Sequence, residues 1–264
     1  MIAIRELSKY FYRGSINEVL ALDRIDLNIE SGDFITVIGS NGAGKSTLLN
    51  CLAGTFLPDS GSLRLHDRDI TRWPEHRRAR FVGRVFQDPL TGTCASLSIE
   101  QNMAMAARRG GRRGLSIGVN DRQRETFQRH LKSIGLGLED RLKSSVGLLS
   151  GGQRQALTMA MATLVEPEIL LLDEHTAALD PKTAVQILEL TRELVERRRL
   201  TTLMVTHNMN HALSFGNRLV MLHRGRVLFD VRGREKEHLT KEDLIQRFYD
   251  SQGEEFSTDR MLLG

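Results

Sequence analysis

The sequence predicts an α/β fold in which helices interrupt a mostly parallel sheet, and three patterns indicate it. Apolar and polar residues alternate near the N-terminus, which predicts antiparallel strands with one exposed face over 2–11, 19–29 and 61–67. Continuous apolar runs, typical of buried parallel strands, occur at 34–39, 169–173 and 201–207. From about residue 89 to residue 165, helical spacing replaces both strand patterns.

The order of these segments supports a parallel core. The strand at 34–39 leads through a glycine-rich turn into a short helix that ends at Gly54. The segment 181–198 has helical spacing and joins two apolar strands, which makes a βαβ unit. A βαβ unit requires a parallel strand pair, so the core is predicted to be α/β.

The C-terminal part closes the fold. The turn Arg224-Gly225 between two apolar runs predicts a hairpin. Thr240 is placed to cap a last helix that carries Leu244, Ile245 and Phe248. We expect one domain over 1–264, with these parts: a core with its antiparallel sheet at 1–87 and 166–235, a helical subdomain at 88–165, and a C-terminal helix and tail at 236–264.

The composition favours a chain without membrane spans. The longest strongly apolar run, 156–165, has ten residues, against about 20 for a transmembrane helix. Arg5 and Glu6 stand where a secretory signal needs apolar residues, so we expect a cytoplasmic chain. Cys51 and Cys94 lie far apart without metal-ligand spacing, so we expect neither a disulfide nor a zinc site.

The net charge of +4 is concentrated in arginine clusters. We interpret these clusters as solvated faces, with an anionic membrane surface or nucleic acid as alternative partners. They comprise Arg77, Arg78 and Arg80, then Arg108, Arg109, Arg112 and Arg113, and finally Arg197, Arg198 and Arg199.

Residues 39–46, GSNGAGKS, match the P-loop pattern between a predicted strand and a predicted helix. Glycines let backbone N–H groups curl around phosphate oxygens, and the helix N-terminus adds the positive end of its dipole. Lys45 would reach the outer phosphates, and Ser46 would offer its hydroxyl to magnesium. The predicted nucleotide contacts are Gly39, Ser40, Asn41, Gly42, Ala43, Gly44, Lys45, Ser46 and Thr47.

Polar residues follow two other apolar strands, where ligands of parallel sheets bind. Asp173 and Glu174 follow the strand ILLL, and two adjacent carboxylates suggest divided roles. Asp173 would hold the magnesium, and Glu174 would polarise the attacking water as general base. His207 ends a second strand and could donate to the γ-phosphate.

A second helix start suited to phosphate follows Leu149, in the stretch LSGGQ. Ser150, Gly151 and Gly152 would expose N–H groups without intervening side chains. One chain cannot easily use both starts on one nucleotide. If two chains pack head to tail, each P-loop faces the other chain's Ser150, and two ATP molecules lie in the interface.

These motifs together make the chain resemble the ABC-type ATPases over nearly its whole length. Residues 39–46 resemble Walker A, 149–153 with Gln153 resemble the signature motif, and ILLLDE resembles Walker B. The resemblance implies a RecA-like P-loop NTPase core with an N-terminal antiparallel β-subdomain and an inserted α-helical subdomain, with ATP and magnesium as cofactors. His207 is then the switch histidine.

Further site residues come only from this resemblance. Gln87 resembles the Q-loop residue that touches magnesium or water, and Asp180 resembles the D-loop residue. Phe11 stands where the family places an aromatic on adenine, although Tyr10 and Tyr12 flank it and either could serve. Two residues depart from the family pattern. His175 replaces the usual proline and is interpreted as a tolerated loop residue, and Ala177 replaces the usual serine, which puts a cross-dimer hydrogen bond in doubt.

Three functions were compared on this basis. A P-loop kinase has no use for LSGGQ, Gln87 and His207 in register. A soluble ABC ATPase of DNA repair or translation would carry coiled-coil insertions or tandem cassettes. The single cassette therefore favours the separate ATPase subunit of a bacterial importer, bound peripherally at the cytoplasmic face of the membrane.

The importer hypothesis also implies partners. We expect a homodimer of ATPase subunits, an integral membrane permease and, indirectly, a substrate-binding protein, with no nucleic acid. The imported solute would be small and could be an amino acid. A permease helix would lie in a groove beside the Q-loop, lined by Leu90, Leu97, Ile99 and Met103, for which core packing is the alternative.

Overall fold

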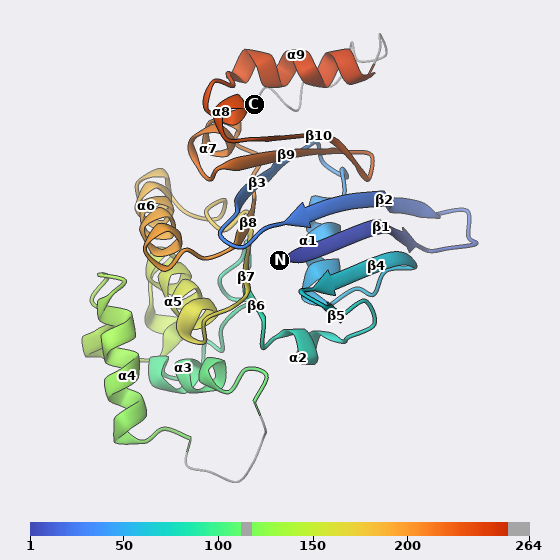
Figure 1. The fold of residues 1–264 in the computed structure, drawn as a ribbon. Helices are drawn as coiled ribbons and strands as arrows, with labels where there is room; N and C mark the ends of the chain where they lie inside the picture. The colour runs from blue at the N-terminus through green and yellow to red at the C-terminus, as the bar shows by residue number, and fades with distance from the viewer. Residues whose placement is uncertain (112–117, 253–264) are drawn as a thin grey trace. The chain divides into compact units, whose positions relative to one another are not determined.

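The computed structural model describes residues 1–111 and 118–252 (Figure 1). The chain divides into two compact units. The terminal unit comprises Met1–Glu75 and the segment from Thr201 onward, and the central unit comprises His76–Leu200. The central unit groups two strands with the helices, and the subdomain bounds at 88 and 165 stay a prediction. Residues 112–117 and the predicted tail after residue 252 lie outside the described residues.

The terminal unit contains two sheets. The antiparallel sheet has the order β2-β1-β4-β5, which confirms the predicted antiparallel strands. In the second sheet β3 pairs in parallel with β8 and β9, and β9 forms the predicted hairpin with β10. The elements are β1 (Ile2–Phe11), β2 (Val19–Ile29), β3 (Phe34–Ile38), α1 (Lys45–Ala53), β4 (Ser60–Leu65), β5 (Arg68–Asp69), β8 (Thr202–Val205), α7 (Met209–Ser214), β9 (Arg218–His223), β10 (Arg226–Arg232), α8 (Arg234–Glu237) and α9 (Lys241–Gln252).

The terminal helices end and begin as the sequence predicts. Gly54 caps α1 in the left-handed conformation, with its N–H donating to the Asn50 carbonyl. The Thr240 hydroxyl accepts from the backbone N–H of Asp243 and so caps α9. Leu244 and Phe248 on α9 are buried in a cluster with residues of α7 and β9.

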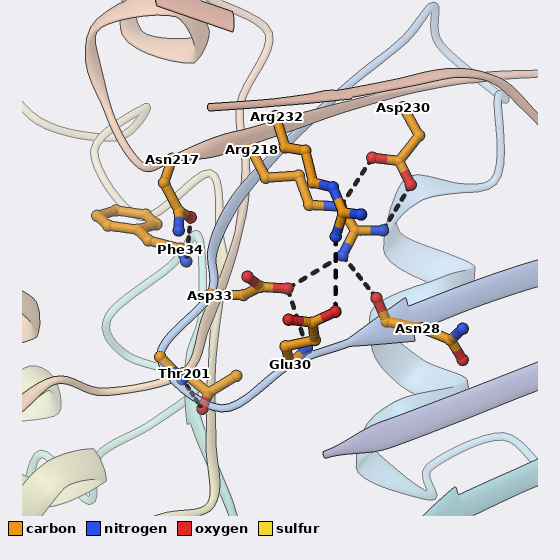
Figure 2. A network of polar contacts seen from close by, with 10 residues as sticks. Asn28, Glu30, Asp33, Phe34, Thr201, Asn217, Arg218, Asp230 and Arg232 are labelled. Carbon is orange, nitrogen blue, oxygen red and sulfur yellow. Dashed lines mark hydrogen bonds and ion pairs between the residues drawn. The ribbon is translucent and has the colours of Figure 1, made fainter. Parts of the chain in front are cut away.

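A buried arginine fixes the hairpin β9–β10 to the strands beside it. Arg218 on β9 donates from Nε to Asp230 at 2.7 Å, and from one terminal nitrogen to Asp33 at 3.0 Å and to the Asn28 carbonyl at 2.6 Å (Figure 2). These carboxylates raise the pKa of Arg218, with the hydrogen bond to Asp230 as the largest cause. The network holds β9 in register beside β3, which leads into the P-loop.

The central unit consists of two parallel strands and the helices that the helical spacing predicts. Its β6 and β7 pair in parallel, and the 181–198 helix has the predicted bounds. The elements are β6 (Val82–Val85), α3 (Ile99–Ala107), α4 (Asp121–Lys132), η1 (Glu139–Arg141), η2 (Val146–Leu148), α5 (Gly151–Leu164), β7 (Ile169–Asp173) and α6 (Pro181–Arg198), with the short α2 (Glu75–Arg78) at the border of the two units.

The core of the central unit corrects part of the predicted groove. Ile99 and Met103 are both 0% exposed and pack in one apolar cluster with α4 and α5. The prediction that these two residues line a docking groove was therefore wrong, because the face of α3 that carries them points into the core. Leu97 is half-buried and Leu90 is exposed.

The arginine clusters are only partly solvated. Among the described residues, an arginine of each cluster turns inward: Arg78 is 1% exposed, while Arg109 and Arg198 are half-buried and donate to carbonyls at the end of α5. The interpretation as solvated faces was wrong for these three, which are buried or half-buried. Arg109 and Arg198 turn inward because the end of α5 needs donors for its free carbonyls. Arg77, Arg80, Arg108, Arg197 and Arg199 are exposed, whereas Arg112 and Arg113 lie outside the described residues.

None of the helices in the described part of the chain is long and apolar enough to cross a bilayer.

Candidate nucleotide site

In the terminal unit the P-loop and His207 leave the sheet at the same edge. Val37 of β3 is paired with Val205 of β8, and the Thr206 N–H donates to the Val37 carbonyl at 3.1 Å. Because the two strands are parallel, their carboxyl ends emerge side by side. Residues 39–46 follow one strand directly, and the exposed His207 follows the other.

The P-loop is shaped by two glycines at which a Cβ would collide with backbone atoms. Gly39 has φ +151°, and a Cβ there would lie 2.2 Å from the Leu222 carbonyl oxygen. Gly44 has φ +99°, and its Cβ would lie 2.5 Å from the Ala21 carbonyl oxygen. The loop is therefore wedged between the backbones of β9 and β2, and the Gly225 N–H also donates to the Ala43 carbonyl at 3.1 Å.

Lys45 begins α1 with its side chain folded into the loop. Its ammonium donates to the carbonyls of Gly39 at 2.8 Å and Ser40 at 3.0 Å, and the residue is 7% exposed. The first turn of α1 contains no acidic residue, and Ser46 is exposed there. A positive helix end with one fixed ammonium can bind an anion.

In the central unit a second pair of parallel strands brings Gln87 and two carboxylates to one edge. Val85 of β6 is paired with Leu172 of β7, so Gln87 and Asp173 follow at the same end. Arg84 links the two strands, with its guanidinium 3.4 Å from the Asp173 carboxylate and 4.5 Å from the centre of the Phe86 ring. The side chains of Arg84 and Asp173 are 13% and 15% exposed.

Glu174 occupies an unusual backbone position. Its φ is +44°, in the left-handed region that non-glycine residues rarely adopt. Its carbonyl accepts from the Ala177 N–H at 2.9 Å, which closes a turn directly after β7. Residues held in such conformations cluster at functional sites, which is consistent with the catalytic role predicted for Glu174.

The LSGGQ stretch forms the start of α5, as predicted. The Ser150 hydroxyl accepts from the Gln153 N–H at 3.2 Å, and the Gln153 side-chain oxygen accepts from the Ser150 N–H at 3.3 Å, which is a capping box. The first turn of α5 has no acidic residue, whereas α3 and α4 begin with Glu100 and Asp121. Its positive end is therefore not neutralised by its own side chains.

Gly152 has a packing role that the sequence reasoning missed. A Cβ on it would lie 2.2 Å from Cγ2 of Thr183, in the first turn of α6. Asp180 caps α6 by accepting from the Thr183 N–H at 3.1 Å. Hydrogen bonds from the Thr183 side chain and from its backbone lower the pKa of Asp180. The close contact at Gly152 thus places the predicted signature and D-loop residues side by side at two helix N-termini.

The other end of α5 is held by arginines. Arg109 donates to the carbonyls of Ala162 and Val165 at 3.0 Å each, and Arg198 donates to the Thr163 carbonyl at 3.0 Å. These bonds satisfy carbonyls that the helix leaves free, and the positive charges suit its C-terminus. The helix is fixed at this end while Ser150 and Gly151 remain exposed at the other.

The aromatic residues at the end of β1 differ in what covers their rings. Phe11 is half-buried and packs edge to face on Phe56, with ring centres 5.3 Å apart. The Tyr10 ring is covered by the Arg13 guanidinium at 4.9 Å. Tyr12 is 74% exposed. The assignment of Phe11 to adenine stays a prediction.

The two departures from the family pattern have different surroundings. His175 is 2% exposed and its Nε2 lies 3.0 Å from the Thr191 hydroxyl of α6. His175 lies in the turn after β7, as expected for a loop residue, and its ring ties this segment to α6. Ala177 is exposed.

Comparison with known proteins agrees with this architecture. Residues 22–177 match the family described as ABC transporter. The chain belongs to this family. It is 44% identical over 248 residues to a tyrosine transport ATP-binding protein of Clostridioides difficile, covering 94% of this chain and 98% of that protein. It is 34% identical over 246 residues to the methionine import ATP-binding protein MetN of Bartonella henselae, covering 91% of this chain and 67% of that protein.

Solved ABC cassettes share the fold. A dimeric post-hydrolysis structure of the cassette MJ0796 bound to ADP and Pi has a TM-score of 0.75 at 29% identity, covering 88% of this chain and 98% of that chain. The predicted P-loop NTPase fold is thereby confirmed, and this member of the ABC family is an ATP-binding ATPase.

Two polar residues near the site were not predicted from the sequence. Arg84 is a charged residue within the short strand β6, and Gln155 is a fully buried polar residue of α5. A charged or amide residue inside an otherwise apolar element is a signal that could have identified both.

Proposed function

We propose that the chain is the ATP-hydrolysing subunit of an importer, and that two copies bind two ATP molecules between them. The observation that carries this proposal is the presence of two anion-ready helix starts in one chain, at Lys45 and Ser150. Neither start has an acidic residue in its first turn. Head-to-tail pairing gives each nucleotide one start from each chain.

The chemistry follows from the residues at the two strand edges. Lys45 would move its ammonium from the loop carbonyls to the outer phosphates. Glu174 would take the proton of the attacking water, and His207 would donate to the γ-phosphate. Contacts to the γ-phosphate exist only before hydrolysis, so closed and open dimers would alternate with the nucleotide state.

Magnesium fits the donors that the site offers. The Ser46 hydroxyl, the Asp173 carboxylate and the Gln87 amide oxygen are all hard oxygen ligands, which Mg²⁺ prefers. When bound, Mg²⁺ neutralises charge on the phosphate oxygens. Asp173 would be its carboxylate ligand, and Arg84, 3.4 Å away, would orient that carboxylate.

A permease is the partner that this function requires, and the chain would lie peripherally at the cytoplasmic face of the membrane. Leu97, Ala104 and Met105 line a hollow of about 180 Å³ beside α3, and Met105 is 50% exposed. We propose this hollow as the groove for a permease helix, in place of Ile99 and Met103. Co-purification of a multi-span protein from native membranes in mild detergent, lost on Met105→Asp, would support it, whereas unchanged recovery would contradict it.

The solute is proposed to be an amino acid. The relative that matches 94% of this chain is named for tyrosine transport, and the solute itself would be selected by the permease and a substrate-binding protein. Uptake of labelled tyrosine is compared between cells that carry the wild-type chain and cells that carry the Lys45→Ala variant, and lower uptake with the variant would support this proposal. Equal uptake in both would contradict it.

The catalytic assignment is tested with Glu174→Gln. The variant keeps the shape of the side chain but not its basicity, so turnover should fall about 10² to 10⁴-fold while ATP binding is kept. The ATP-bound dimer should accumulate and be visible by size-exclusion chromatography. Turnover near that of the wild type would refute Glu174 as the base.

The dimer is tested with Ser150→Arg. A bulky cation at the exposed start of α5 should prevent closure of the dimer and leave ATP binding at the P-loop largely intact. Asn120→Arg is the matched control, since Asn120 caps α4 with the same kind of capping box. A similar loss of ATP binding by the Ser150→Arg monomer would argue against the sandwich.

A further inference from the structure

Gln155 is a fully buried amide on the helix that begins at the signature motif. It is 0% exposed, and its Nε2 lies 3.2 Å from the backbone carbonyl oxygen of Phe86. A carbonyl oxygen only accepts, so the amide group must present its NH₂ to Phe86. The next residue after Phe86 is Gln87, the predicted Q-loop residue. The side chain thus joins α5 to the backbone that leads directly into Gln87.

The other half of the amide makes Gln155 an unusual core residue. Its Oε1 is buried and has no hydrogen-bond partner among the described residues. The neighbouring Ala156, Leu157 and Met159 on the helix are all 0% exposed and apolar. A buried acceptor without a partner is destabilising, and an apolar side chain of the same size would avoid that cost. An apolar residue, however, could not donate the hydrogen bond to the Phe86 carbonyl.

The packing of α5 on β6 makes this bond possible and rigid. Gly83 of β6 has no Cβ, and one placed there would lie 2.7 Å from the Ala162 carbonyl of α5. Helix and strand therefore approach closely without an intervening side chain. At the far end of α5, Arg109 and Arg198 hold the terminal carbonyls. Because this packing is tight, a displacement of the start of α5 would also move Phe86.

The contacts continue from Phe86 to the predicted magnesium ligand. The Arg84 guanidinium lies 4.5 Å from the centre of the Phe86 ring and 3.4 Å from the Asp173 carboxylate. The start of α5, the residue before Gln87 and Asp173 are thus connected through two side chains, Gln155 and Arg84. All of these residues belong to the central unit.

We propose that Gln155 is a positioning residue that couples the start of α5 to Gln87. Its bond to the Phe86 carbonyl sets the direction in which the chain leaves β6, and so places the Gln87 side chain for hydrolysis. When a phosphate binds at Ser150, five residues before Gln155, the same bond transmits the shift of the helix to Gln87. This inference rests on the proposed role of Gln87 in hydrolysis.

A double-mutant cycle tests the coupling on the full chain. Gln155→Met keeps the length and approximate volume of the side chain but removes the donor, and Gln155→Asn keeps the amide but shortens its reach. Each should lower kcat about tenfold, as loss of residues that orient a site typically does, while ATP binding without magnesium stays unchanged. In the Gln87→Ala background, the same change at Gln155 should alter kcat less than twofold, because the residue through which it acts is gone.

Thr163→Val provides the matched control. Thr163 is also a buried polar residue of α5, but its hydroxyl donates to the Met159 carbonyl within the helix. This variant should lose stability without losing kcat. Unchanged kcat in the Gln155 variants, or losses that multiply with those of Gln87→Ala, would overturn the coupling alone. Wild-type turnover in Gln87→Ala would instead remove the proposed role of Gln87, and the inference with it.

Discussion

The P-loop and the signature helix start are both suited to phosphate, yet they are built by different means. In the P-loop, Gly39 and Gly44 press against backbone carbonyls of neighbouring strands, and Lys45 donates to the loop itself. At the signature start, Ser150 is held by a reciprocal side-chain cap, and Gly152 packs against the side chain of Thr183. The first is constrained by backbone, the second by side chains.

This difference indicates which of the two starts can adjust. The contact of the two glycines with backbone atoms allows only one arrangement, because the carbonyl oxygens of paired strands cannot move aside. A side-chain contact can be relieved by a rotamer change or by a smaller residue. We therefore expect the P-loop to keep one shape, and the start of α5 to be the part that can change position.

The largest effect is expected at the backbone wedge. Gly39→Ala adds a Cβ 2.2 Å from the Leu222 carbonyl at a φ of +151°, which should lower the free energy of unfolding by about 3 to 5 kcal/mol. Urea unfolding followed by the fluorescence of Trp73, the single tryptophan, would measure it. Gly42→Ala is the control: its φ is +77° but a Cβ there meets nothing within 4 Å, so only about 1 kcal/mol should be lost. Equal losses would show that the wedge is not what constrains the loop.

A smaller loss of stability is expected at the signature helix, and a second substitution should restore it. Gly152→Ala adds a Cβ 2.2 Å from Cγ2 of Thr183, and such overpacking typically costs about 1 to 3 kcal/mol. Thr183→Ser removes that methyl group and keeps the N–H that Asp180 caps. The double variant should therefore regain most of the lost stability in urea unfolding monitored by circular dichroism. No second side-chain change can rescue Gly39→Ala in this way.

Gly151→Ala is the control that separates the effect of the contact with Thr183 from the effect of replacing a glycine. Its Cβ would lie 3.3 Å from Cδ2 of Leu179, the end of a flexible side chain, and the loss should stay below about 1 kcal/mol. If Thr183→Ser fails to rescue Gly152→Ala, the two phosphate-binding starts are equally rigid and the contrast between them is wrong.

The sequence predicted the elements whose patterns are local. The P-loop strand and helix, the antiparallel strands, the closing hairpin and the cap at Thr240 follow from spacing and capping residues that lie within a few positions of one another. The signature serine was likewise placed at a helix start, because Ser-x-x-Gln is a local capping box.

Contacts between distant segments were not predictable in the same way. Ile99 and Met103 have the spacing of a helix face, but only the packing of α4 and α5 decides that this face is buried. Arg78, Arg109 and Arg198 lie in charge runs that look solvated, although each turns inward. The role of Gly152 depends on Thr183, which is far along the chain, and spacing alone carries no information about that partner.

The last effect concerns pH, because a histidine supports the signature helix. His130 is 9% exposed, accepts from Arg198 at Nδ1 over 3.1 Å, and lies with Nε2 2.9 Å from the Ala160 carbonyl of α5. Arg198 only donates and the carbonyl only accepts, so the ring is neutral with its proton on Nε2.

Burial, together with the charges of Arg198 and Arg197, lowers the pKa of His130 below its ordinary value of 6.5. Between pH 6.5 and the lower folded pKa the unfolded chain binds the additional proton, so stability is kept above pH 6.5 and falls as the pH decreases. At pH 5.5 this histidine should remove at most about 1.4 kcal/mol relative to pH 7.5. His130→Gln keeps a donor for Ala160 but does not titrate, and should lose less stability over the same range in urea unfolding. An identical pH dependence in both proteins would mean that the signature helix does not depend on the neutral ring.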